Sequence, residues 1–110
     1  MPDARLVYTT WPDPELAAKA AEIFVSERLA ACANLIPGAL AFFWWRGEVQ
    51  AETEVVMMLK TTRDRARALR DRLIELHPYE TPAFSVLEID EARSNPTYID
   101  WIRREVRMVE

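Results

Sequence analysis

The pattern of hydrophobic and polar positions predicts a strand followed by a helix at the start of the chain. A short apolar run at residues 6–10 is typical of a strand. Polar residues then recur at spacings of three and four, which places them on one stripe of a helix. The helix is expected to run from its N-cap Asp13, with proline next in the chain, to about Ala31. Its core-facing residues are Leu16, Ala20, Ile23 and Phe24.

The middle of the chain predicts a long β-hairpin. Residues 33–37 and 39–45 form its first arm, and Arg46-Gly47 is a turn signal. Acidic and polar residues then alternate with apolar ones with a period of two, and the strand continues to Lys60-Thr61. A strand over residues 48–61 would be roughly 46 Å long at about 3.3 Å per residue. A compact domain of this size is only ~35 Å across. The tip of the hairpin is therefore expected to project.

Four consecutive aromatic residues precede that turn: Phe42, Phe43, Trp44 and Trp45. Alternation along a strand would point them to both faces of the ribbon, and only one face can lie on the protein's own core. A bulge that folds all four inside is the alternative. Otherwise a partner must cover the exposed aromatics, and closed homo-oligomers are the common solution. The sequence thus predicts self-association through these four residues without choosing a symmetry.

The second half of the chain predicts two more helices and one more strand. Thr61 is the expected N-cap of the second helix, which should end before Pro78 and bury Ala66, Leu69, Leu73 and Leu76. Residues 83–89 form a strand, and Asn95 caps a third helix holding Tyr98, Trp101, Ile102, Val106 and Val109. The order β-α-β-β-α-β-α predicts an α+β, ferredoxin-like sandwich of an antiparallel four-stranded sheet with two helices on one face and a further C-terminal helix.

Composition narrows the class of protein. A chain of 110 residues, half of them hydrophobic, is long enough for one domain, spanning residues 1–110. The net charge of −4 argues against nucleic-acid binding. The chain contains no run of 18 apolar residues, so no membrane span is predicted. A single cysteine and the absence of a secretory pattern at the N-terminus predict a cytoplasmic protein.

Several segments in order resemble one family. The longest is the run at residues 27–38, Glu-Arg-Leu-Ala-Ala-Cys-Ala-Asn-Leu-Ile-Pro-Gly; Trp45-Arg46-Gly47, Glu54, Lys60-Thr61, His77-Pro78-Tyr79-Glu80-Thr81-Pro82 and Tyr98-Ile99-Asp100-Trp101 follow it. Over nearly its whole length the chain resembles the CutA family of divalent-cation tolerance proteins. The resemblance implies a ferredoxin-like protomer in a homotrimer similar to the PII signalling proteins, which hold ligands in clefts between subunits. It also implies a link to copper and other divalent cations.

A few residues could carry chemistry. His77 is the one histidine and Cys32 the one cysteine, so they are the candidate soft-metal ligands. His77 could instead bond backbone at a helix end, and Cys32 could be a small buried hydrophobe. Some members of the family that the chain resembles carry a cysteine where this chain has Tyr8 and a second histidine where it has Leu76. Candidates for lining a ligand cleft between subunits, by their match to the family, are Glu54, Lys60, Tyr79, Glu80, Tyr98 and Trp101.

The favoured interpretation is a trimeric, non-enzymatic protein that binds copper, another divalent cation or a small ligand in its clefts. An enzyme using Lys60, Glu54 and His77 is an alternative, and so is a purely structural trimeric scaffold. An RNA-recognition module shares the order of elements, but its sheet needs base-stacking aromatics, and the strand after the hairpin turn carries an acidic row instead.

Overall fold

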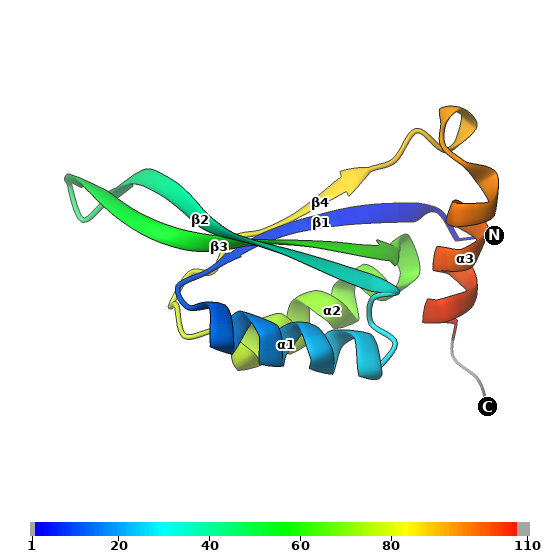
Figure 1. The fold of residues 1–110 in the computed structure, drawn as a ribbon, viewed down its shortest axis with the longest axis horizontal. Helices are drawn as coiled ribbons and strands as arrows, with labels where there is room; N and C mark the ends of the chain where they lie inside the picture. The colour runs from blue at the N-terminus through cyan, green and yellow to red at the C-terminus, as the bar shows by residue number, and fades with distance from the viewer. Residues whose placement is uncertain (1, 108–110) are drawn as a thin grey trace.

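Two helices cover one face of an antiparallel sheet, and a third helix packs at its end (Figure 1). This computed structural model describes residues 2–107. The strands follow the spatial order β2-β3-β1-β4. The elements are β1 (Ala4–Trp11), α1 (Pro14–Ser26), β2 (Cys32–Trp45), β3 (Glu48–Thr62), α2 (Arg63–Leu76), β4 (Phe84–Glu88), a 3₁₀ helix η1 (Glu91–Arg93) and α3 (Pro96–Val106). The predicted α+β, ferredoxin-like fold is confirmed.

Two of the three helix starts lie at the predicted caps. The Asp13 carboxylate accepts from the Leu16 amide at 2.8 Å, and Asn95 caps α3 in the same way. The first helix, however, ends at Ser26 and not near Ala31. Arg28 adopts a left-handed conformation, with φ of 58°, and the amide of Leu29 turns back to the Phe24 carbonyl. A left-handed residue just beyond the last turn is a common way for a helix to end.

The second helix starts one residue later than predicted. Thr61 still belongs to β3, and its buried hydroxyl donates to the Leu29 carbonyl at 2.7 Å. Thr62 is the N-cap, but its hydroxyl bonds Asp64, so no side chain caps the backbone there. The helix ends at Leu76, before Pro78, as predicted.

The main core lies between the sheet and the helices α1 and α2. Phe24, Leu69 and Leu73 are fully buried there, as the helical stripes predict, and the strands add the buried side chains of Trp11 and Met57. A smaller cluster forms where α3 meets the N-terminal end of β1, around Ala4, Ile99 and Ile102. Val109, expected in the third helix, lies outside the described residues.

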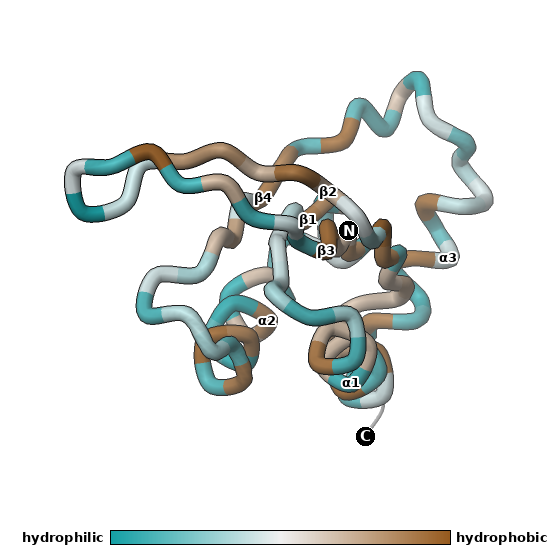
Figure 2. The backbone as a smooth tube through the Cα atoms, turned by 60° about the vertical axis from the view of Figure 1, so that its left-hand side comes forward, coloured by the Kyte–Doolittle hydropathy of each residue, from teal (hydrophilic) through white to brown (hydrophobic). Residues whose placement is uncertain are grey.

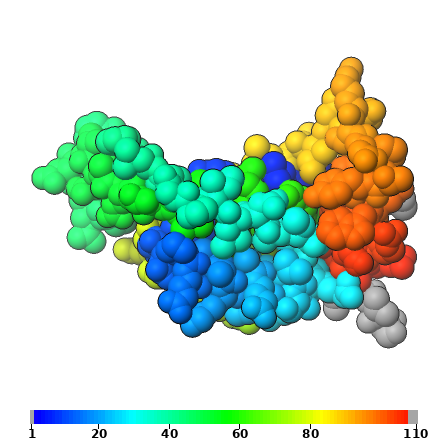
Figure 3. Space-filling model, in the orientation of Figure 1, coloured from blue at the N-terminus to red at the C-terminus, as the bar shows by residue number. Residues whose placement is uncertain are grey.

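The β2–β3 hairpin extends beyond the layer of helices (Figures 1 and 3). The molecule measures 45 × 31 × 21 Å, and its turn has positive φ at both Arg46 and Gly47, the geometry of a tight hairpin turn. A bulge interrupts β2 between Ile36 and Ala39, yet it does not fold the aromatics inside: Phe42, Phe43, Trp44 and Trp45 are all exposed. Figure 2 shows the brown apolar run on one arm of the hairpin and mostly teal residues on the other.

Candidate functional site

A cleft of about 690 Å³ opens where the hairpin leaves the sheet. The hairpin aromatics Phe43, Trp44 and Trp45 line one side, and the segment after α2 lines the other. Three carboxylates open into the cleft, from Glu52, Glu54 and Glu80. The cleft therefore combines negative charge with aromatic walls.

Strand alternation explains why carboxylates face this cleft. Val55 and Met57 are buried under the helices, so their neighbours Glu52 and Glu54 point to the opposite face of the sheet. Across the ladder, Glu54 pairs with Ala39 and Glu52 with Ala41. The small alanine side chains leave space beside the carboxylates, and the aromatic residues further along the hairpin close that space on one side.

Tyr79 fixes the position of Glu54. Its hydroxyl donates to the Glu54 carboxylate at 3.2 Å. Burial, followed by the charge and hydrogen bond of Glu54, raises the pKa of Tyr79 to about 12. The phenol therefore stays protonated at neutral pH and remains a hydrogen-bond donor, which orients the Glu54 carboxylate in the cleft.

His77 holds the backbone of Tyr79 against the first strand. Its Nε2–H donates to the Thr10 carbonyl at 2.7 Å, and its Nδ1 accepts from the Tyr79 amide at 3.1 Å. The ring packs against Trp11 and Tyr79, with centroids 4.2 Å and 4.8 Å away. Burial lowers the pKa of His77, although the bond to Thr10 and the charge of Glu54 act in the opposite direction. His77 is thus neutral, and both of its nitrogens are already bonded to backbone.

The remaining predicted site residues lie elsewhere in the protomer. Lys60 is six residues from Glu54 along β3, which corresponds to roughly 20 Å. Its ammonium group bonds the Asn34 amide oxygen and lies 3.7 Å from the Cys32 sulfur. Tyr98 and Trp101 stack on each other at 5.7 Å on α3. Within the protomer, the structure brings together Glu54, Tyr79, Glu80 and the hairpin aromatics, but not these residues.

Sequence reasoning missed some members of the cleft. Glu52 belongs to the acidic row of the strand after the hairpin turn and is not among the predicted site residues, and Thr10 is predicted only as part of the first strand. The period-two alternation around Glu54 could have identified Glu52, since it lies two positions away on the same face. Nothing in the sequence indicates Thr10, because its contribution is a backbone carbonyl.

The described part of a single protomer holds no complete metal site. Among residues 2–107, no three histidine, cysteine, aspartate or glutamate side chains are grouped so that they could hold a metal ion. Protein sites for metals such as zinc use three or four protein ligands. Nor does any helix in that range combine the length and hydrophobicity needed to span a bilayer.

The neutral state of His77 predicts a specific dependence of stability on pH. The pKa of His77 in the folded state lies below the ordinary value of about 6.5. Between these two pKa values the histidine is protonated in the unfolded chain but neutral in the folded protein. The free energy of unfolding is therefore expected to fall as pH decreases below about 6.5, until the lower folded-state pKa is reached. Protonation at Nδ1 would also break the bond from the Tyr79 amide.

Urea denaturation of the wild type and His77→Gln between pH 8 and 4.5 measures this effect. Other titrating groups affect both proteins alike. The free energy of unfolding should therefore fall more steeply with decreasing pH in the wild type than in His77→Gln. Parallel stability profiles would show that His77 does not titrate in this way.

The fold and the cleft define a ferredoxin-like protein with an acidic, aromatic-walled cleft at the base of a long hairpin. Residues 5–105 match the family model described as CutA1 divalent ion tolerance protein. The chain belongs to the CutA1 family, as its resemblance in sequence implied.

Individual relatives agree with this assignment. The divalent-cation tolerance protein CutA of Pyrococcus horikoshii is 41% identical over 102 residues, covering 93% of this chain and 97% of that protein. The PII-like protein CutA from Nostoc sp. PCC 7120 superposes with a TM-score of 0.88 at 37% identity, over 96% and 99% of the two chains. A structure described as the periplasmic divalent cation tolerance protein CutA from Archaeoglobus fulgidus has a TM-score of 0.89 at 34% identity, over 94% and 99%.

Proposed function

We propose that the protein is a homotrimer that binds a divalent cation, with copper as the first candidate, in clefts completed by neighbouring subunits. The observation that carries the proposal is that Glu52, Glu54 and Glu80 all line one cleft beside the exposed hairpin aromatics. The family description, divalent ion tolerance, agrees with a role in the response to metal ions.

The surface of the protomer favours self-association. Phe42 and Trp44 are 69% and 74% exposed, and the open face of the sheet adds the exposed side chains of Tyr8, Ile36 and Leu87. Exposed apolar surface of this kind usually marks an interface. The sheet also has two free edges, β2 and β4, and contacts between unlike edges can close into a ring. The number three comes from the resemblance to CutA and PII proteins.

Carboxylates are the preferred ligands in this proposal. Glu54 and Glu80 supply oxygen donors that suit divalent cations, and a neighbouring subunit would complete the set. His77 is a weaker candidate because both of its nitrogens bond backbone. Cys32 is also weaker because it lies beside Lys60, away from the cleft. A small ligand in place of the cation would use the same cleft.

Binding, and not catalysis, is the proposed activity. An enzyme built on Lys60, Glu54 and His77 would need the three side chains to converge, and within the protomer Lys60 bonds Asn34 at a distance from the other two. We place the protein in the cytoplasm, where its free Cys32 would stay reduced. Cell fractionation tests this placement, since one relative is described as periplasmic.

Native mass spectrometry with one equivalent of Cu²⁺ per chain tests the proposal. Trimers with a discrete number of copper ions are expected, and Glu54→Gln should weaken copper binding by about tenfold or more through loss of a charged ligand. Glu22→Gln, which removes an exposed carboxylate on α1, is the matched control and should bind as the wild type does.

The same spectra distinguish the alternatives. Loss of copper in His77→Gln or Cys32→Ser, with Glu54→Gln unaffected, would move the site to the soft ligands. Trimers without copper under all conditions would reject the cation site and favour a small ligand or a structural scaffold.

A further inference from the structure

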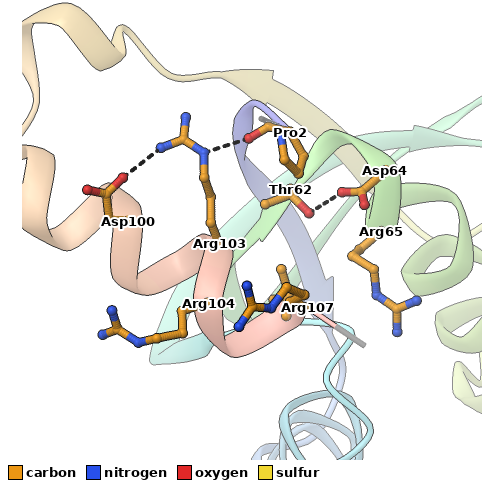
Figure 4. A pocket seen from close by; sticks show the side chains of 9 residues that line it. Pro2, Thr62, Asp64, Arg65, Asp100, Arg103, Arg104 and Arg107 are labelled. Atoms are coloured by element: carbon orange, nitrogen blue, oxygen red, sulfur yellow. Dashed lines mark hydrogen bonds and ion pairs between the residues drawn. The ribbon is translucent and has the colours of Figure 1, made fainter. Parts of the chain in front are cut away.

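A second pocket, of about 540 Å³, lies beside α3 (Figure 4). This helix is at the opposite end of the molecule from the hairpin (Figure 1). The last turns of α3, the start of α2 and Pro2 line it. These segments are far apart in the sequence and meet here because α3 packs across the end of the sheet. The pocket shares no residue with the acidic cleft.

Arginines dominate the lining of this second pocket. Arg65 comes from α2, and Arg103, Arg104 and Arg107 come from α3 and the residue after it. The chain as a whole carries a net charge of −4, so a concentration of positive charge at one place contrasts with the rest of the molecule. Figure 4 shows Arg104 and Arg107 at the end of α3 and Arg65 on the other side, at the start of α2.

Only one of these arginines is fully engaged with neighbouring groups. Arg103 donates to the Pro2 carbonyl at 2.7 Å, to Asp100 at 3.1 Å and to Glu91. The Arg65 Nε bonds the Arg28 carbonyl at 3.3 Å, which positions the side chain without neutralising it. Within residues 2–107, none of Arg65, Arg104 and Arg107 forms an ion pair.

The acidic residues in the lining do not balance this charge. Asp100 pairs with Arg103, which leaves Asp64 as the other carboxylate against three arginines. The Asp64 carboxylate is held by the Thr62 hydroxyl at the rim (Figure 4). The N-terminus of α2 adds to the positive potential of the pocket. No side chain caps it, and the positive end of the helix dipole lies there.

We propose that this pocket binds a small phosphate-bearing anion. Guanidinium groups recognise phosphate through paired hydrogen bonds, and several of them together match a multiply charged group better than a single carboxylate. A diphosphate, with two charged groups, is a suitable probe for a pocket whose arginines come from both α2 and α3. The proposal is independent of cation binding in the acidic cleft, since the two sites share no side chain.

Isothermal titration calorimetry with inorganic pyrophosphate, in metal-free buffer, tests the proposal. The wild type is expected to bind, with affinity falling as KCl is raised because the attraction is electrostatic. Arg104→Ala and Arg107→Ala should each weaken binding by about tenfold. Arg70→Ala removes an equal charge from an exposed site on α2, paired with Asp71, and should bind as the wild type does.

The remaining measurements separate a specific site from general charge attraction. Citrate of comparable charge should bind more weakly, and equal affinity would overturn the assignment to phosphate. Circular dichroism and native mass should be unchanged in the variants, and Arg65→Ala provides a second variant on a different helix. Absence of pyrophosphate binding by the wild type at millimolar concentration, or equal loss in Arg70→Ala, would overturn the proposal.

Discussion

Replacing Trp44 with glutamate is expected to convert the assembled protein into monomers. Trp44 is 74% exposed at the projecting hairpin tip, where the proposed trimer would cover it. A charge buried there without a partner costs several kcal/mol, and about 3 kcal/mol per interface shifts association by roughly 100-fold. A closed ring buries one such glutamate at every subunit contact, so the loss of association free energy is repeated at each contact.

Native mass spectrometry at micromolar concentration measures this change. Val25→Glu is the matched control, because it places the same charge at an exposed apolar position on α1, away from the hairpin. The control should assemble as the wild type does. A Trp44→Glu protein that keeps the wild-type mass would place the tip outside the interface.

The second large effect is expected in the core, where Leu73→Ala should lower the free energy of unfolding by about 2–5 kcal/mol. Leu73 is fully buried between α2 and the sheet, so its truncation leaves a cavity. Its neighbour Ile74 is 55% exposed on the same helix. Ile74→Ala should therefore change stability by no more than about 0.5 kcal/mol.

Urea denaturation at one fixed protein concentration compares the two variants, since the stability of an oligomer depends on concentration. The pair tests the burial pattern directly, because the substitutions differ by one position. Similar losses for both variants would contradict an orientation of α2 in which Leu73 faces the sheet and Ile74 faces solvent.

Local signals in the sequence were sufficient for most of the fold. Asp13 and Asn95 cap helices through contacts within three residues, and Arg46-Gly47 forms the turn with its own backbone angles. The predictions that failed at element ends have tertiary causes. Helix α1 ends early because the chain after it returns to β3, where the Ala31 amide bonds the Lys60 carbonyl.

The residues that line the cleft were predicted only in part. Glu54, Tyr79 and Glu80 were named from their match to the family, and the structure brings them into one cleft. The same match also named Lys60 and Trp101, which lie elsewhere in the protomer. Glu54 and Lys60 lie on the same strand, yet this does not bring them together, because six residues of extended chain span roughly 20 Å.

By itself, the sequence determined the periodicities, two of the three helix caps and the hairpin turn, because each depends on neighbours within a few residues. It also predicted the projecting hairpin, because the strand is longer than a compact domain of this size is wide. The tertiary structure alone decided that His77 bonds the Thr10 carbonyl, and that Arg65 and Arg107 line the same pocket. These contacts join residues separated by dozens of positions. They form only when the helices dock on the sheet, and hydrophobic periodicity fixes which face docks but not which polar groups then meet.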